Sequence, residues 1–247
     1  PSNILYFPHF HQEGEWRSYL SIVNLCESDI QVTLTAYDSS GAIIAQTNKI
    51  LSAKSKLAGF VDSPNIFGSA LSRKKGWIQV SGTCYIAGLM NFDNYPTNTL
   101  MGSYSGIGFP QKKLVFPHFH QDGGWRTYIS IVNVGNEPIE VTLMAFSENG
   151  ELLAYRYVTI ASKSKIEGFV NHIFPRLTGK GWIIVYSDKP NLVGILNFDN
   201  YPTSTLMGSL ESCFYALPDW ENNAYGHLEF PHFHMDTLWR TYVSFIR

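Results

Sequence analysis

Three histidine pairs are the residues of this sequence whose types and spacing could do chemistry. Each pair reads His-x-His inside the string FPHFH, which begins at Phe7, Phe116 and Phe230. On a β-strand, residues i and i+2 point to the same face, so each pair would present two imidazoles side by side. Neutral imidazoles are good ligands for divalent transition metals. The candidate metal ligands are therefore His9, His11, His118, His120, His232 and His234.

The sequence leaves these histidines open between a metal site and a structural role. The run from His9 to Glu15 matches the first metal motif of cupins, but Gly124 and Leu238 replace the glutamate in the other two strings. In the structural alternative, each imidazole stacks on the tryptophan that follows and hydrogen-bonds to the neighbouring chain. These tryptophans are Trp16, Trp125 and Trp239. A divalent transition metal is thus one of two expectations, and the sequence does not supply a third ligand.

A second polar run, NFDNYPT, begins at Asn91 and again at Asn197. Its amide and carboxylate oxygens could bind calcium or sugar hydroxyls, whereas the same residue types also form Asx turns. A carbohydrate would in addition stack on exposed tryptophan rings. The candidate ligand-binding residues are Asn91, Asp93, Asn94, Asn197, Asp199, Asn200, Trp16, Trp125 and Trp239.

The arginines that follow the three tryptophans, Arg17, Arg126 and Arg240, have potential partners in these polar runs. We expect them to form partly buried ion pairs with Asp93 or Asp199. No GxSxG, HExxH or P-loop motif occurs in the sequence. The sequence therefore predicts no catalytic residue and no residue that binds an organic cofactor.

The histidine strings belong to an internal repeat. Segments 5–25 and 114–134 are identical at 15 of 21 positions, and the polar run closes both copies. A period near 110 residues is too long for a solenoid unit, so each copy should be a domain. We predict one domain at 1–107, a second at 114–212, and the opening strands of an incomplete third repeat at 228–247.

Within each copy the apolar residues alternate with period two, which is typical of half-buried strands. Turn signals such as Asp38–Gly41 and Ser147–Gly150 separate the apolar runs. Seven or eight short strands per copy predict an all-β fold of tandem antiparallel β-sandwiches, either immunoglobulin-like or jelly-roll-like. Short helical turns are expected at 64–72 and 172–178.

The repeat resembles a module that recurs in secreted bacterial proteins. The resemblance rests on FPHF, a Gly-containing turn before Trp, a strand that ends in Val-Asn, and the later Gly181-Trp182 and Gly194 to Phe198 patterns. It implies a β-sandwich that serves as an accessory or surface module, with no assigned activity. The second histidine of FPHFH departs from that pattern.

Charge and cysteine content exclude some classes of function. The net charge of −2 and the lack of a basic tract argue against nucleic acid, and no apolar run is long enough to predict a membrane span. The three cysteines, Cys26, Cys84 and Cys213, show no metal-type spacing. A Cys26–Cys84 disulfide and free thiols both remain open.

These patterns favour a non-catalytic extracellular, cell-surface or periplasmic protein that mediates binding, adhesion or assembly. Its partner would be a carbohydrate or another protein surface, and the partial third repeat could allow self-association. The alternative is a metal-binding protein or metal-dependent enzyme that uses the His-x-His pairs.

Overall fold

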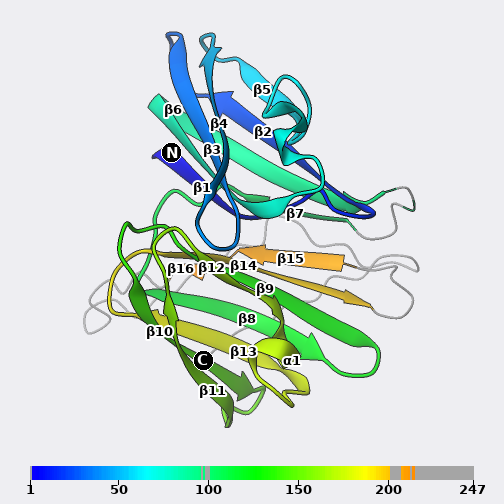
Figure 1. Ribbon diagram of the computed structural model, residues 1–247. Helices are drawn as coiled ribbons and strands as arrows, with labels where there is room; N and C mark the ends of the chain where they lie inside the picture. Colours follow the sequence, from blue (N-terminus) through cyan, green and yellow to red (C-terminus); the bar gives the residue numbers. More distant parts are fainter. Residues whose placement is uncertain (1, 96, 98–100, 201–206, 212, 215–247) are drawn as a thin grey trace.

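The computed structural model describes residues 2–95, 97, 101–200, 207–211 and 213–214. We refer to β1–β7 as the first repeat and to β8–β16 as the second repeat (Figure 1). The first contains β1 (Ser2–His11), β2 (Trp16–Asn24), β3 (Ile30–Tyr37), β4 (Ile43–Leu51), β5 (Lys56–Phe60), β6 (Lys75–Asn94) and β7 (Met101–Ser105). The second contains β8 (Lys113–Gln121), β9 (Trp125–Asn133), β10 (Ile139–Ser147), β11 (Leu152–Ile160), β12 (Lys165–Phe169), β13 (Gly179–Ser187), β14 (Leu192–Asn200), β15 (Met207–Glu211) and β16 (Cys213–Phe214).

Both repeats pair equivalent strands in the same antiparallel way, but the two sheets are separate in the second repeat and joined into one 7-stranded sheet in the first. In the second repeat the sheets have the orders β11-β10-β13-β8-β16 and β12-β9-β14-β15. In the first repeat the long strand β6 serves both sheets: residues 75–82 pair with β1 and β3, and residues 86–94 pair with β2 and β7. The predicted all-β class of sandwich type is therefore confirmed.

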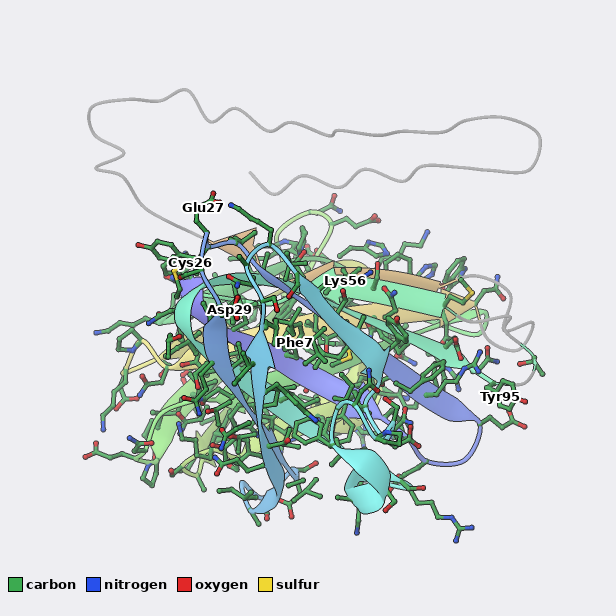
Figure 2. The ribbon with its side chains drawn as sticks, turned by 90° about the horizontal axis from the view of Figure 1, so that it is seen from above. Phe7, Cys26, Glu27, Asp29, Lys56 and Tyr95 are labelled. Carbon is green, nitrogen blue, oxygen red and sulfur yellow. A yellow bond between two sulfur atoms is a disulfide. The ribbon has the colours of Figure 1, made fainter. Side chains whose placement is uncertain are left out.

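The alternating apolar pattern places one side of each strand in a core. On β2, Leu20 and Ile22 are fully buried, while Tyr19 and Ser21 remain partly exposed. Phe7 of β1 lies in the middle of the first repeat (Figure 2). Strand β9 has almost the same sequence as β2, yet both of its faces are largely buried. The outer face of β9 must therefore be covered by a second layer.

The Gly-Trp motif is explained by the close approach of two strands. A Cβ atom at Gly76 would overlap the carbonyl oxygen of Tyr37, and one at Gly181 would overlap that of Phe146. Only glycine fits where another backbone comes so near. The tryptophan that follows then stacks on the neighbouring ring, with Trp77 at 4.3 Å from Tyr37 between ring centroids.

The Val-Asn ending of β2 and β9 marks a buried asparagine that organises the chain around it. Asn24 Nδ2 donates to the carbonyl oxygens of Ser28, Leu51 and Ser52, and Asn24 Oδ1 accepts from the amide of Cys26. The equivalent Asn133 makes the corresponding set of bonds. A fully satisfied buried amide fixes the end of the strand.

A disulfide joins Cys26, just after β2, to Cys84 in the middle of β6. This settles the choice that the sequence left open for these two residues. Of the expected helical turns, η1 (Gly68–Leu71) lies within 64–72, whereas α1 (Val170–Ile173) begins earlier than 172–178. No helix in the described ranges is long and apolar enough to cross a membrane. The third repeat, with its His232, His234 and Trp239, lies outside the described residues.

Reduction of the Cys26–Cys84 disulfide is predicted to destabilise the first repeat. The bond joins residues 58 positions apart, and in the chain-entropy model a loop of that length contributes about 4 kcal/mol at 25 °C. Chemical denaturation with and without a thiol reductant measures the difference. A Cys26→Ser, Cys84→Ser variant should match the reduced protein and ignore the reductant. Equal denaturation midpoints for oxidised and reduced wild-type protein would contradict the prediction.

Candidate functional site

The first His-x-His pair lies where the two repeats meet. In Figure 1 the sheet of β12, β9, β14 and β15 faces the first repeat, and β10 and β11 lie on the far side. Ser130 Oγ on β9 donates to the carbonyl oxygen of Pro8 at 2.8 Å. The His9 ring lies 5.2 Å from the Tyr128 ring, and His9 is only 6% exposed. Strand β1 therefore supplies part of the layer that covers β9.

A buried ion pair sits at the centre of this junction. Lys165 Nζ lies 2.5 Å from Glu167 Oε2, and the Lys165 side chain has no exposed surface. Lys165 Nζ also donates to the carbonyl oxygen of Gly76 at 2.9 Å. Glu167 accepts hydrogen bonds from Ser39 Oγ and Tyr128 Oη, both at 2.7 Å. The network thus joins β12 of the second repeat to two separate segments of the first.

Burial and charge set the protonation states of this network. Burial, with the nearby Lys165 ammonium, lowers the pKa of His9 to about 4, so its ring is neutral at neutral pH. Burial acts to raise the pKa of Glu167, but the bond to His9 and the Lys165 charge hold it well below the usual range. Burial and the Glu167 charge raise the pKa of Tyr128, which stays protonated. Glu167 is thus an ionised acceptor, and His9 Nδ1 lies 3.2 Å from Glu167 Oε2 and 3.3 Å from Lys165 Nζ.

A pocket of about 280 Å³, the junction pocket, opens beside the network. Its walls bring together residues of both repeats: His9, His11, Trp16, Lys75, Phe92, Arg126, Tyr128, Phe169, Asn197 and Asp199. Asn197 Oδ1 is buried and has no hydrogen-bond partner in the described part of the chain. A donor group that entered the pocket would find an acceptor there. Aromatic rings with a few polar groups suit a small polar ligand.

The four described histidines of the His-x-His pairs each contact an aromatic ring. His11 stacks on Trp16 with ring centroids 5.9 Å apart, and His120 stacks on Trp125 at 5.3 Å. His120 Nε2 also lies 2.6 Å from Asp122 Oδ2. The stacking expected of the structural alternative is therefore present at both sites. Among the described residues no three His, Cys, Asp or Glu side chains are grouped to hold a metal ion, and a bound transition metal stays a prediction.

The first four residues of each polar run, 91–94 and 197–200, form the ends of strands β6 and β14, and a turn follows β6 at Tyr95. The expected ion pairs form: Arg17 Nε lies 2.6 Å from Asp93 Oδ1, and Arg126 Nε lies 2.8 Å from Asp199 Oδ1. Asn94 and Asn200 pair in register with Trp16 and Trp125. In each repeat the structure therefore brings these candidates together.

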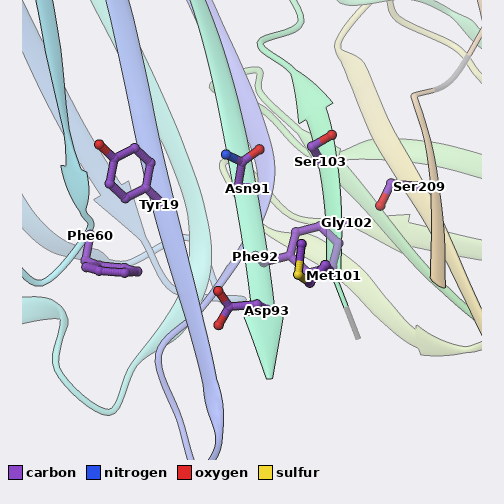
Figure 3. A pocket seen from close by; sticks show the side chains of 9 residues that line it. All are labelled: Tyr19, Phe60, Asn91, Phe92, Asp93, Met101, Gly102, Ser103 and Ser209. Carbon is purple, nitrogen blue, oxygen red and sulfur yellow. The ribbon is translucent and has the colours of Figure 1, made fainter. Parts of the chain in front are cut away.

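Asn91 and Asp93 line a second, larger pocket of about 660 Å³, which we call the first-repeat pocket because all its lining residues except Ser209 of β15 come from the first repeat. Figure 3 shows Tyr19 and Phe60 on one side of it, Ser103 and Ser209 on the other, and the β6 residues between them. Asn197 and Asp199, their counterparts, line the junction pocket. The same polar run therefore contributes to both pockets.

Sequence reasoning did not identify Lys165, Glu167, Tyr128 or Ser130 as site residues. A signal was present at one of them, because the first repeat has Ala58 where the second has Glu167. A carboxylate that appears in one copy at an otherwise shared strand position suggests that this copy has a neighbour of its own.

Comparisons with known proteins give little further information. No model of a known protein family matches this chain, and no curated protein sequence matches it. A solved structure from Thermotoga maritima, described as Thermotoga maritima 1070, is 13% identical with a TM-score of 0.38 and covers 42% of this chain and 95% of its own. The Anabaena sensory rhodopsin transducer is 12% identical with a TM-score of 0.29, over 34% of this chain and 92% of its own. A Bacteroides uniformis β-glucuronidase is 8% identical with a TM-score of 0.17, over 79% of this chain and 24% of its own. Likeness at this level transfers neither function nor site residues.

Glu167→Gln is predicted to lower the free energy of unfolding by about 3 kcal/mol or more, because it leaves the Lys165 charge buried without a counter-ion. Glu137→Gln is the matched control in the same repeat. Its partner Lys189 is in a solvent-exposed pair, so the loss should stay below about 1 kcal/mol. Denaturant titration of both variants measures the difference. Equal losses would show that the buried pair does not hold the junction.

Lowering the pH from about 6.5 towards 4 is predicted to destabilise the protein, in part through His9. The folded state keeps His9 neutral down to a pKa of about 4, against 6.5 for an unperturbed histidine. The unfolded chain therefore binds the extra proton in this window, and stability falls by up to about 1.4 kcal/mol per pH unit.

Melting temperatures across this window test the contribution of His9. His9→Asn should flatten the slope, although His11 and His118, whose pKa values burial also lowers, preserve part of it. His172→Asn, at an exposed histidine, is the control and should leave the slope unchanged. The same slope in His9→Asn and wild type would refute the assignment.

Proposed function

We propose that this chain is a non-catalytic β-sandwich repeat protein of the cell surface, periplasm or extracellular space that acts by binding and assembly. The observation that carries the proposal is the junction, where one repeat recognises the outer sheet face of the other. We call the outer side of β9, β12 and β14 the receiving face. We call β1, the turn Asp38–Gly41 and the start of β6 the docking edge.

The receiving face and the docking edge form a specific contact with both apolar and polar parts. An apolar cluster joins Tyr37, Trp77 and Ile107 of the first repeat to Val132, Val134 and Val193 of the second. The Trp77 indole donates to the carbonyl oxygen of Lys163 at 2.9 Å. Combined with the buried Lys165–Glu167 pair, this is the composition of a stable interface: an apolar centre with hydrogen-bonded polar groups around it.

The Cys26–Cys84 disulfide supports a location outside the cytoplasm. Disulfides persist in oxidising compartments and are rare where thiols are kept reduced. This agrees with the surface-module role that the sequence resemblance implies.

A carbohydrate is the second candidate partner, and the first-repeat pocket favours it. The rings of Tyr19 and Phe60 stand beside the amide of Asn91 and the carboxylate of Asp93. Aromatic faces with adjacent amide and carboxylate oxygens suit a sugar, which has apolar ring faces and hydroxyl groups. The occupant of this pocket is tested in the experiment that closes the next subsection.

Trp77→Ala is predicted to loosen the two repeats from each other. Trp77 is fully buried at the junction, whereas its counterpart Trp182 is partly exposed and stacks on Phe146 in the same way. Small-angle X-ray scattering of dilute protein should show a larger radius of gyration for Trp77→Ala, and calorimetry should separate the melting of the two repeats. Trp182→Ala is the matched control and should keep the wild-type dimensions. If Trp77→Ala leaves scattering and melting unchanged, the repeats do not depend on each other and the assembly proposal fails.

A further inference from the structure

The receiving face of the second repeat has a counterpart in the first. Tyr128 pairs in register with Asn197 and with Phe169, and Tyr19 pairs in register with Asn91 and with Phe60. The counterpart face therefore lies on the outer side of β2, β5 and the second part of β6. Its residues are Tyr19, Ser21, Val23, Lys56, Ala58, Ala87, Leu89 and Asn91.

This counterpart face is exposed where the receiving face is covered. Ile195 is 0% exposed and packs into the core cluster of the first repeat, whereas its counterpart Leu89 is 38% exposed. Ser130 and Val132 are fully buried, whereas Ser21 and Val23 are only partly buried. The first-repeat pocket lies on this same face. Among the described residues, a surface that is covered in one repeat is thus left exposed in the other.

The second repeat also has a docking edge of its own. The string Phe116–His120 repeats Phe7–His11, and Phe146 stacks on Trp182 at 4.4 Å as Tyr37 stacks on Trp77. The turns have equal geometry as well, since the amide of Gly41 donates to the Asp38 carbonyl and that of Gly150 to the Ser147 carbonyl. In the turn Ser147–Gly150, Glu148 occupies the position that Ser39 occupies in the turn Asp38–Gly41.

The charges of the open face and this second edge are complementary. At the junction, Ser39 of the docking edge bonds to Glu167, which neutralises Lys165. On the open face the lysine is retained as Lys56, exposed, but alanine replaces the glutamate at Ala58. On the second edge Glu148 is exposed. At the junction the carboxylate belongs to the receiving face, as Glu167, whereas for the open face it belongs to the second edge, as Glu148. A lysine–carboxylate pair could therefore form in both cases.

We propose that the open face of the first repeat binds the docking edge of the second repeat of another molecule of this chain, with Glu148 paired to Lys56. Figure 2 places Lys56 on the first repeat. The inference rests on the proposed assembly function and names its partner. Because face and edge are different surfaces, the contact is heterologous and either closes into a ring or extends into a filament.

Analytical ultracentrifugation of the full chain over a range of concentrations tests the proposal. Wild type should associate with increasing concentration. Leu89→Glu should weaken association by about tenfold or more, because it places a charge at the centre of the contact. Ile43→Glu makes the same change at a more exposed residue on β4, in the other sheet, and should associate as wild type does. An equal effect of both variants would overturn the proposal.

A charge exchange tests the pairing itself. Lys56→Glu and Glu148→Lys should each weaken association by about tenfold, and the double variant should recover most of it. Lys49→Glu on β4 is the control for the lysine and should leave association unchanged. Two single losses without recovery in the double variant would overturn the assigned pair.

The remaining outcomes identify other occupants and also overturn the proposal. Association that is lost on deletion of residues 228–247 but insensitive to Glu148→Lys would assign the open face to the third FPHFH string. A monomer at every concentration, with glycan-array binding that Leu89→Glu abolishes, would assign it to carbohydrate. In either case the scattering result for Trp77→Ala stands independently, so failure of this inference is distinguishable from failure of the proposed function.

Discussion

The packing of the two repeats depends on a lysine ammonium that has no exposed surface. Lys165 needs Glu167 as counter-ion and donates hydrogen bonds to main-chain oxygens of the other repeat. If the repeats separated, Glu167 would stay beside Lys165 on β12, but water would have to replace the main-chain oxygens of Pro8 and Gly76. A buried pair of this kind adds little net stability compared with an apolar core, but a misaligned one is costly. The apolar cluster around Trp77 therefore supplies attraction, and the ion pair supplies the orientation.

The two repeats show how one strand sequence can serve two environments. β2 and β9 have nearly the same side chains, and their inward faces fill equivalent cores. Their outward faces differ in burial because β9 has a neighbouring sheet and β2 has an open surface. Tyrosine, serine and valine on that face tolerate both environments. They pack well when another surface covers them, and their exposure to water costs little free energy.

Much of the fold and part of the site could be predicted from sequence, for a physical reason. Strand period, turn signals, the stacking of His11 and His120 and the Arg17–Asp93 pair all depend on residues that are close in sequence or that lie in paired strands. The junction depends on which outer face meets which edge. Lys56 and Lys165 stand at equivalent places with opposite burial, so residue type alone could not locate the network.

The two-sheet strand β6 has a mechanical consequence for the first repeat. Its 20 residues pair with four other strands and run through both sheets without a break. In the second repeat the same path is interrupted between β13 and β14, at residues 188–191. Tension applied along β6 would load both hydrogen-bond ladders at once, and the disulfide at Cys84 would share that load. The first repeat should therefore unfold under force as one unit. In the second repeat, the break at residues 188–191 should allow one sheet to unfold before the other.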